Sequence, residues 1–368
     1  MKHGRLYKFT IFALILGTLY GAGYVFYYWD PTRVIWKRWV EKDPYRYEKI
    51  NPVYLKTNPA DLITIHSPED AKRVRAALIA AVFGPQGLPT AKEPAKVEKN
   101  LVLDENLASQ KDAGPFYARI GNLAGVDRIF VKIDGEYFAK ILHFRPKKGN
   151  GRLVLFQNGF GGTGTFNDRK ERIAELVDEG YGVMAFNLPA LGGNNLKERY
   201  LPRYGWYLLG SWRLLDLVDY PMRYWFEPVV VALNYGLGEM GYKSADMIGF
   251  SMGGWLTMVA AALDTRIRRS YPVAGGYPLY LRSGNEAKES PRPHYYAPMI
   301  RAANYLEMFI LATVGKPRRQ LQVFNRFDRC CYSNTKGKLY EKAVKDAARL
   351  AGGGQFDVLI DETHARHK

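Results

Sequence analysis

The sequence SADMIGFSMGGWLTMVAAAL, residues 244–263, constrains this chain most, because a strand must turn sharply into a helix within it. The apolar run Met247–Phe250 predicts a buried strand, and the residues after the last glycine predict a helix. Ser251 falls between them, with Gly249 two residues before it and Gly253 two residues after it. So tight a turn leaves no room for side chains at the two glycine positions. We therefore expect Ser251 to stand exposed at the carboxyl end of the strand.

From residue 126 onward, short apolar runs alternate with helical stretches, and this order predicts a mostly parallel sheet with helices on both faces. An antiparallel hairpin around Asp134-Gly135 opens the sheet. The expected strands are 128–133, 136–144, 152–157, 182–187, 247–250, 269–274, 321–325 and 356–360, and the main expected helices are 167–179, 228–240 and 255–263. The fold class is therefore α/β, with residues 126–368 as the principal domain.

The N-terminal stretch Phe9–Trp29 carries no charged residue and matches the roughly 20 residues that a helix needs to cross the hydrocarbon core of a membrane. Its aromatic end, Tyr27-Tyr28-Trp29, favours a retained transmembrane helix over a cleaved signal peptide. We therefore expect residues 1–29 to be a single-pass membrane anchor. Basic residues flank both ends of the stretch, so the positive-inside rule assigns no orientation.

Residues 30–125, between the expected anchor and the sheet, are interpreted as membrane-proximal helices and an irregular connector. Asp30-Pro31 is typical of a helix start, and the amphipathic helix after it would lie on the membrane surface or pack on the principal domain. Another helix is predicted from Ser67 to about Phe83. Residues 85–113 are rich in Lys, Glu, Pro and Ala and predict a solvated loop.

The composition argues against several classes of site. The 368 residues include 53 Lys and Arg against 36 Asp and Glu, a formal charge of +17, but no nucleic-acid-binding motif accompanies them, which favours an anionic membrane surface over nucleic acid. The two cysteines, Cys330 and Cys331, are adjacent and cannot join distant segments. The six histidines lack the spacing of a zinc site, so neither a metal nor a cofactor is expected.

Ser251, Asp328 and a histidine, His364 or His367, each follow the carboxyl end of an expected strand, in that order along the chain. In this order, and in the segments GFSMGGW and NRFDRCC, the chain from about residue 126 onward resembles bacterial members of the α/β-hydrolase superfamily. The resemblance implies an α/β-hydrolase fold and a site of the serine hydrolase type.

A serine hydroxyl is a weak nucleophile and must lose its proton to an imidazole as it attacks, while a carboxylate orients the imidazole and stabilises its charged form. Ser251 is the expected nucleophile and Asp328 the expected orienting acid. Asp361 and Glu362 are alternatives to Asp328, although they would have to fold back on the loop that carries the histidines.

The expected base is His364, because its distance from the last strand matches the position of this residue in relatives. His367 is the alternative, and its surroundings in the sequence resemble the ends of related chains more closely. Few residues follow either histidine before Lys368, whereas relatives have a closing helix there.

Two backbone amides are expected to stabilise the oxyanion of the tetrahedral intermediate. One is the amide of Met252, at the start of the helix behind Ser251. The other should come from the loop Asn158–Gly162, where the match with relatives assigns the amide of Phe160, with Gly161 as the alternative.

Two segments, about 188–226 and 281–305, occur where lid elements usually enter this fold. Their many Trp, Tyr and Leu residues predict a small-molecule or lipid-like ester with an apolar or aromatic group.

The sequence thus predicts a membrane-anchored serine hydrolase that cleaves a carboxylic ester through an acyl-enzyme. Two alternatives stay open. One is a non-catalytic binding or scaffold protein with the same fold, which the short segment after His364 suggests. The other is an acyltransferase that uses the same three residues. The sequence leaves the oligomeric state undetermined.

Overall fold

The computed structural model describes residues 2–28, 34–35, 50–103, 113–135, 137–159, 169–194, 198–201, 203–208, 212–282, 291–315, 317–328 and 330–367. For residues 2–10, 26–28 and some loop positions it describes the backbone alone.

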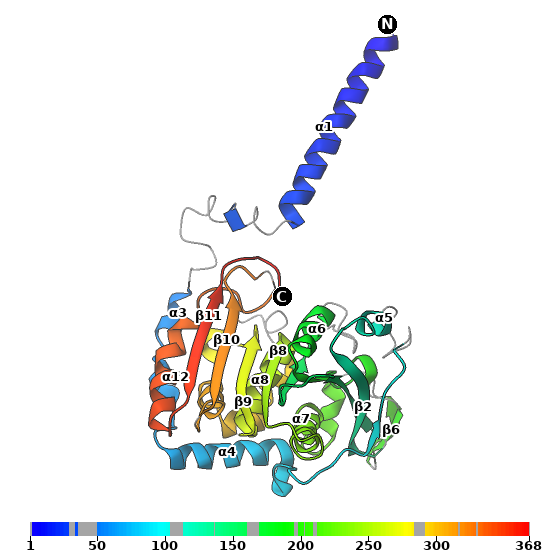
Figure 1. Ribbon diagram of the computed structural model, residues 1–368. Helices are drawn as coiled ribbons and strands as arrows, with labels where there is room; N and C mark the ends of the chain where they lie inside the picture. The colour runs from blue at the N-terminus through cyan, green and yellow to red at the C-terminus, as the bar shows by residue number, and fades with distance from the viewer. Residues whose placement is uncertain are drawn as a thin grey trace.

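The described strands form one large sheet in the order β1-β2-β3-β5-β4-β8-β9-β10-β11 (Figure 1). The first three pairings along this order are antiparallel, and the remaining five are parallel. The strands are β1 Lys96–Glu98, β2 Leu123–Asp134, β3 Tyr137–Pro146, β4 Arg152–Gln157, β5 Gly182–Phe186, β8 Ser244–Phe250, β9 Ile267–Val273, β10 Arg319–Asn325 and β11 Gln355–Asp361. A separate hairpin joins β6 Glu198–Leu201 to β7 Gly205–Leu208. The expectation of a mostly parallel α/β sheet opened by an antiparallel hairpin is confirmed.

Helices cover both faces of this sheet. The α-helices are α1 Lys2–Tyr28, α3 Pro52–Leu55, α4 Pro68–Phe83, α5 Ala113–Tyr117, α6 Lys170–Asp178, α7 Arg223–Leu237, α8 Met252–Leu263, α10 Ala297–Ala302, α11 Tyr305–Leu311 and α12 Lys338–Leu350. Short 3₁₀ helices are η1 Pro59–Leu62, η2 Gly84–Gln86, η4 Gly192–Asn194, η5 Trp212–Leu217, η6 Leu279–Leu281 and η7 Arg292–Tyr295. Helix α7 begins ahead of the predicted Pro228, because Tyr224, Trp225 and Phe226 are buried in the core and extend the helix toward its N-terminus.

Alternation along the strands separates two hydrophobic cores. In β5, Val183 and Ala185 pack with α6, whereas Met184 and Phe186 belong to the larger core that contains α7, α8, α11 and α12. Successive side chains of a strand point to opposite faces, so this pattern buries both faces of the sheet. Every residue of α8 is buried, which makes it the central helix of the larger core.

Helix α4 precedes the sheet in the sequence yet packs within the larger core. Its buried side chains include Val74 and Leu78. From the same helix, Arg75 donates hydrogen bonds to the carbonyls of Ala262 (2.9 Å) and Leu311 (2.7 Å), at the ends of α8 and α11. Arg318 donates to the Leu311 carbonyl as well, at 2.8 Å. A cation at a helix C-terminus satisfies unpaired carbonyls and opposes the negative end of the helix dipole.

None of the helices in the described part of the chain is both long and apolar enough to cross a membrane. The finding contradicts the transmembrane helix expected at residues 9–29 and the single-pass membrane localisation derived from it. Of the amphipathic helix expected after Asp30, only Val34 and Ile35 are described.

Because α4 packs in the core, shortening one of its buried side chains should lower the free energy of unfolding substantially. Leu78 is fully buried, so Leu78→Ala should leave a cavity and lower the free energy of unfolding by about 2–5 kcal/mol. Leu350→Ala removes the same atoms from α12 at a side chain that is 61% exposed, and should cost less than about 0.5 kcal/mol. Urea unfolding of both variants checks the difference. Equal free energies of unfolding would mean that α4 lies outside the cooperative unit.

Candidate active site

The turn between β8 and α8 holds Ser251 in a conformation that few non-glycine residues adopt. Its φ is 56° and its ψ is −119°, and its backbone N–H donates a hydrogen bond to the Val273 carbonyl at 2.7 Å. Such a backbone costs on the order of 1–3 kcal/mol and persists where the surroundings impose it, often at functional sites. The side chain is half-buried, at the first turn of α8.

The glycines on either side of Ser251 are required by close backbone packing. A Cβ atom on Gly249 would lie closer than 3.0 Å to the Gly253 carbonyl oxygen, and one on Gly253 would lie closer than 3.0 Å to the carbonyl oxygens of Gln157 and Asn158. Strand β4, strand β8 and helix α8 therefore meet backbone against backbone. This contact fixes the turn that carries Ser251.

The loop after β4 lies against the same turn. A Cβ atom on Gly159 would be 3.0 Å from both the Phe250 carbonyl oxygen and Ser251 Cβ. The buried Asn158 side chain accepts a hydrogen bond from the Gly159 amide at 2.8 Å, which holds the start of the loop. Phe160 and Gly161, the candidates for the second oxyanion amide, lie outside the described residues. Met252, the candidate for the first, is buried at the start of α8.

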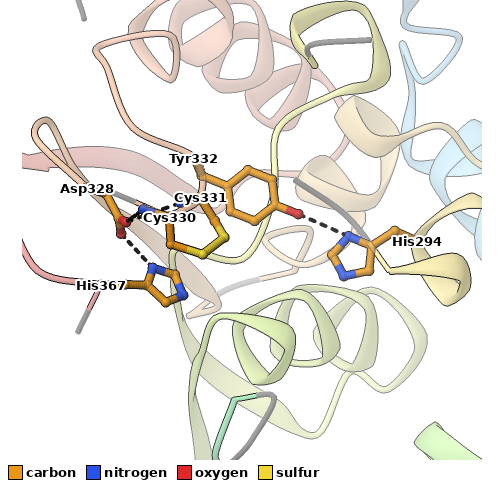
Figure 2. Close-up of a disulfide and its surroundings, with 6 residues drawn as sticks. All are labelled: His294, Asp328, Cys330, Cys331, Tyr332 and His367. Carbon is orange, nitrogen blue, oxygen red and sulfur yellow. Dashed lines mark hydrogen bonds and ion pairs between the residues drawn. A yellow bond between two sulfur atoms is a disulfide. The ribbon is translucent and has the colours of Figure 1, made fainter. Parts of the chain in front are cut away.

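Asp328 and His367 are hydrogen-bonded to each other beside this turn (Figure 2). Asp328 Oδ2 lies 2.6 Å from His367 Nδ1, and Oδ1 accepts hydrogen bonds from the amides of Cys330 (2.8 Å) and Cys331 (3.2 Å). The His367 ring packs on Phe250, the residue before Ser251, with 4.6 Å between ring centroids. The carboxylate therefore accepts the Nδ1 proton and leaves Nε2 as the basic nitrogen. Nε2 is buried and has no hydrogen-bond partner among the described residues.

His364 has different partners. Its Nε2 lies 3.0 Å from Asp361 Oδ2, and its Nδ1 lies 2.5 Å from Asn325 Nδ2. Glu362 pairs with Arg326. The structure thus brings Asp328 together with His367, whereas His364 and Asp361 form a separate pair.

A buried histidine, His294, contacts helix α8. His294 Nε2 lies 3.2 Å from Met252 Sδ, and the imidazole stacks on Trp255 with 4.6 Å between ring centroids. Burial, with the nearby Arg282 cation, lowers the pKa of His294 well below its usual range, so the ring is neutral. Methionine sulfur can only accept, so Nε2 carries the proton and Nδ1 accepts from the Tyr332 hydroxyl at 3.3 Å.

The two cysteines form a disulfide with each other, between adjacent residues. Their sulfur atoms and a ring nitrogen of His367 all lie within 4.8 Å of one another. Sequence spacing predicted no metal-ligand cluster because His367 is distant from the cysteines in the chain. The loops after β10 and β11 bring the three side chains together.

A pocket of about 860 Å³ lies between the two segments that were expected to act as lids. Trp212 and Trp225 line one side and pack edge to face, and Tyr295 and Tyr296 belong to the other. Pro293 and Tyr295, which line the pocket, flank His294 in the chain. Five of its fourteen lining residues are aromatic, most of the others are apolar, and Asp219 and Arg292 are charged.

Solved structures of other proteins have the same fold as this chain. No protein-family model matches the sequence, and no curated protein matches it either. Among solved structures, the methylesterase BT1017 aligns over 88% of this chain and 67% of its own, with a TM-score of 0.60 and 16% identity. A protein from Bacteroides fragilis assigned as an acetyl xylan esterase aligns over 88% of this chain and 84% of its own, with a TM-score of 0.54 and 17% identity. With its sheet order and its strand–turn–helix unit at Ser251, the chain has the α/β-hydrolase fold.

Proposed function

We propose that this protein is a serine hydrolase that cleaves a carboxylic ester through an acyl-enzyme, with Ser251 as nucleophile, His367 as general base and Asp328 as the residue that orients the base. The observation that carries the proposal is the 2.6 Å contact between Asp328 Oδ2 and His367 Nδ1, on a ring that packs against the residue before Ser251. His367 takes the place of the expected His364, because His364 faces Asp361 and Asn325 instead.

In this mechanism, His367 Nε2 accepts the hydroxyl proton of Ser251 as Oγ attacks the ester carbonyl carbon. Asp328 keeps the Nδ1 proton in place and stabilises the imidazolium. Collapse of the tetrahedral intermediate expels the alcohol, which takes the proton from Nε2 and leaves Ser251 acylated. Water then attacks the acyl-enzyme by the same route and regenerates the serine.

The oxyanion that forms in both steps requires donors fixed in advance. The amide of Met252 at the start of α8 is the first, and Phe160 or Gly161 supplies the second. His294 contacts the side chain of Met252 and is neutral, so it holds this residue without adding a charge to the site.

The pocket is the basis for proposing an ester with an apolar or aromatic portion, although Ser251, Asp328 and His367 are not among its lining residues. Its aromatic side chains would gain binding free energy by burying a hydrocarbon chain or ring of the substrate. The charged Asp219 and Arg292 would orient a polar group of the substrate. The two structural relatives are a methylesterase and a protein assigned as an acetyl xylan esterase, and both names refer to ester hydrolysis.

Covalent labelling tests the nucleophile. The purified chain should react with a fluorophosphonate probe, and peptide mass spectrometry should find the adduct on Ser251, because the proposed base would activate its hydroxyl toward phosphorus electrophiles. Ser251→Ala should abolish the adduct and the hydrolysis of p-nitrophenyl acetate. Ser333→Ala is the control that should keep both. A folded protein that takes up no probe would contradict the serine hydrolase proposal.

Substitution of the two C-terminal histidines tests the base. His367→Ala should lower kcat/KM for p-nitrophenyl acetate by about 10⁴-fold, because the proton of Ser251 loses its acceptor. His364→Ala removes the same ring from the neighbouring pair and should change kcat/KM little. The double variant Asp328→Asn/His367→Ala should be no slower than His367→Ala alone, since residues that act as a unit are not additive. A loss confined to His364→Ala would assign the base to that residue instead.

A further inference from the structure

The disulfide between Cys330 and Cys331 lies beside the proposed base. Figure 2 shows both cysteines next to the His367 ring, on the segment that also carries Asp328 and Tyr332. Cys330 is exposed, and Cys331 and His367 are half-buried, so the cluster lies near the surface, although the Nε2 atom of His367 is itself buried. Two sulfur atoms and an imidazole nitrogen within 4.8 Å are close to the separation at which one ion can bind all three.

Ligand geometry makes this separation informative. Zinc binds sulfur at about 2.3 Å and nitrogen at about 2.0–2.1 Å, so two atoms that share one ion lie no more than about 4.6 Å apart. The sulfur and nitrogen atoms are therefore close enough to share one ion, once reduction lets the two bonded sulfurs move apart. Thiolate and imidazole donors select thiophilic metals over magnesium or calcium.

The surroundings of His367 match those of a metal-binding histidine. Such histidines usually donate their second ring N–H to a carboxylate, which fixes the ring and raises the basicity of the coordinating nitrogen. Asp328 occupies this position at 2.6 Å from Nδ1. Nε2 is the remaining nitrogen, and it has no hydrogen-bond partner in the described part of the chain. The same carboxylate binds the amides of both cysteines, so it also holds their loop against the ring.

We propose that reduction of the Cys330–Cys331 disulfide creates a binding site for a thiophilic divalent cation, formed by the two cysteine sulfurs and His367 Nε2. A dithiol reductant transfers two electrons to the disulfide, becomes a cyclic disulfide itself and leaves two cysteine thiols. The cation then displaces one proton from each thiol and binds the two thiolates and the neutral imidazole. In the oxidised protein the sulfurs are bonded to each other and offer no thiolate.

One consequence of this site rests on the proposed function. A cation on Nε2 occupies the lone pair that would accept the proton of Ser251. The reduced, metal-bound protein should therefore be inactive, and removal of the metal should restore turnover. The protein would then respond to the combination of a reductant and a thiophilic metal, and to neither alone.

Cadmium binding tests the site without reference to activity. The full chain is reduced with dithiothreitol, freed of reductant under argon and titrated with Cd²⁺, whose thiolate complexes absorb in the ultraviolet. Bound metal is counted by mass spectrometry of the metal after gel filtration. Reduced protein should bind one Cd²⁺ per chain with a thiolate charge-transfer band, and protein that keeps its disulfide should bind none. Equal binding by the oxidised and reduced forms would refute the proposal.

Variants separate this site from adventitious binding. Cys330→Ser and Cys331→Ser should each remove tight binding. His367→Ala should weaken it by at least about tenfold, and Asp328→Asn by about 10-fold through loss of the carboxylate that holds the ring. His364→Ala is the matched control and should bind Cd²⁺ like the parent chain. Unchanged affinity in His367→Ala would place the ion elsewhere and overturn the assignment.

The two proposals fail independently. If the reduced chain binds Cd²⁺ through His367 but takes up no fluorophosphonate, the metal site stands and the hydrolase proposal fails. If the chain is labelled at Ser251 but Cd²⁺ neither binds to the reduced form nor slows its labelling, the metal site is refuted and the hydrolase proposal stands. When both hold, Cd²⁺ should block labelling of the reduced chain alone, and EDTA should reverse the block.

Discussion

The site depends first on the absence of two side chains. Gly249 and Gly253 let β4, β8 and the first turn of α8 touch backbone to backbone, closer than any Cβ atom would permit. This contact leaves Ser251 with a φ of 56° and directs it away from the strand that precedes it. Because α8 is buried along its whole length, its packing holds the unfavourable backbone conformation of Ser251 in place. The other groups of the site are arranged around a serine whose position is set by this packing and by the hydrogen bond from its amide to the Val273 carbonyl.

Two loops at the carboxyl edge of the sheet then carry Asp328 and His367, the proposed acid and base. The segment after β10 makes two of the contacts of the site. Asp328 is hydrogen-bonded to His367, and Tyr332 is hydrogen-bonded to His294, which contacts Met252. The disulfide lies between these two contacts in the sequence. Reduction of the disulfide would therefore alter the segment that carries both Asp328, which is proposed to orient the base, and Tyr332, which contacts His294 beside Met252.

Local patterns in the sequence predict the parts of this arrangement that follow local rules. The turn at Ser251, the parallel strands and the place of Asp328 after β10 each depend on neighbouring residues, so periodicity and glycine spacing suffice to predict them. The partner of Asp328 depends on how the segment after β11 folds back. Asp361 and Asn325 hold His364, and only tertiary contacts reveal that His367 reaches the acid. The cysteine and histidine cluster is equally invisible, because no spacing rule links residues from separate loops. The transmembrane helix expected at residues 9–29 is wrong, because none of the helices in the described part of the chain is both long and apolar enough to cross a membrane.

The arginine contacts at the C-terminal end of α8 determine which segments must be kept together when domains of this fold are exchanged between proteins. The N-terminal end of this helix carries Ser251, and its C-terminal end is held by Arg75, from a segment that enters the fold before the sheet begins. Arg75 and Arg318 both donate to the Leu311 carbonyl, so the unpaired carbonyls at the helix ends depend on both arginines for hydrogen bonds. A chimera that took the sheet from this protein and α4 from a distant relative would lose one of the two cations. The exchangeable module therefore begins at α4, well ahead of the first central strand.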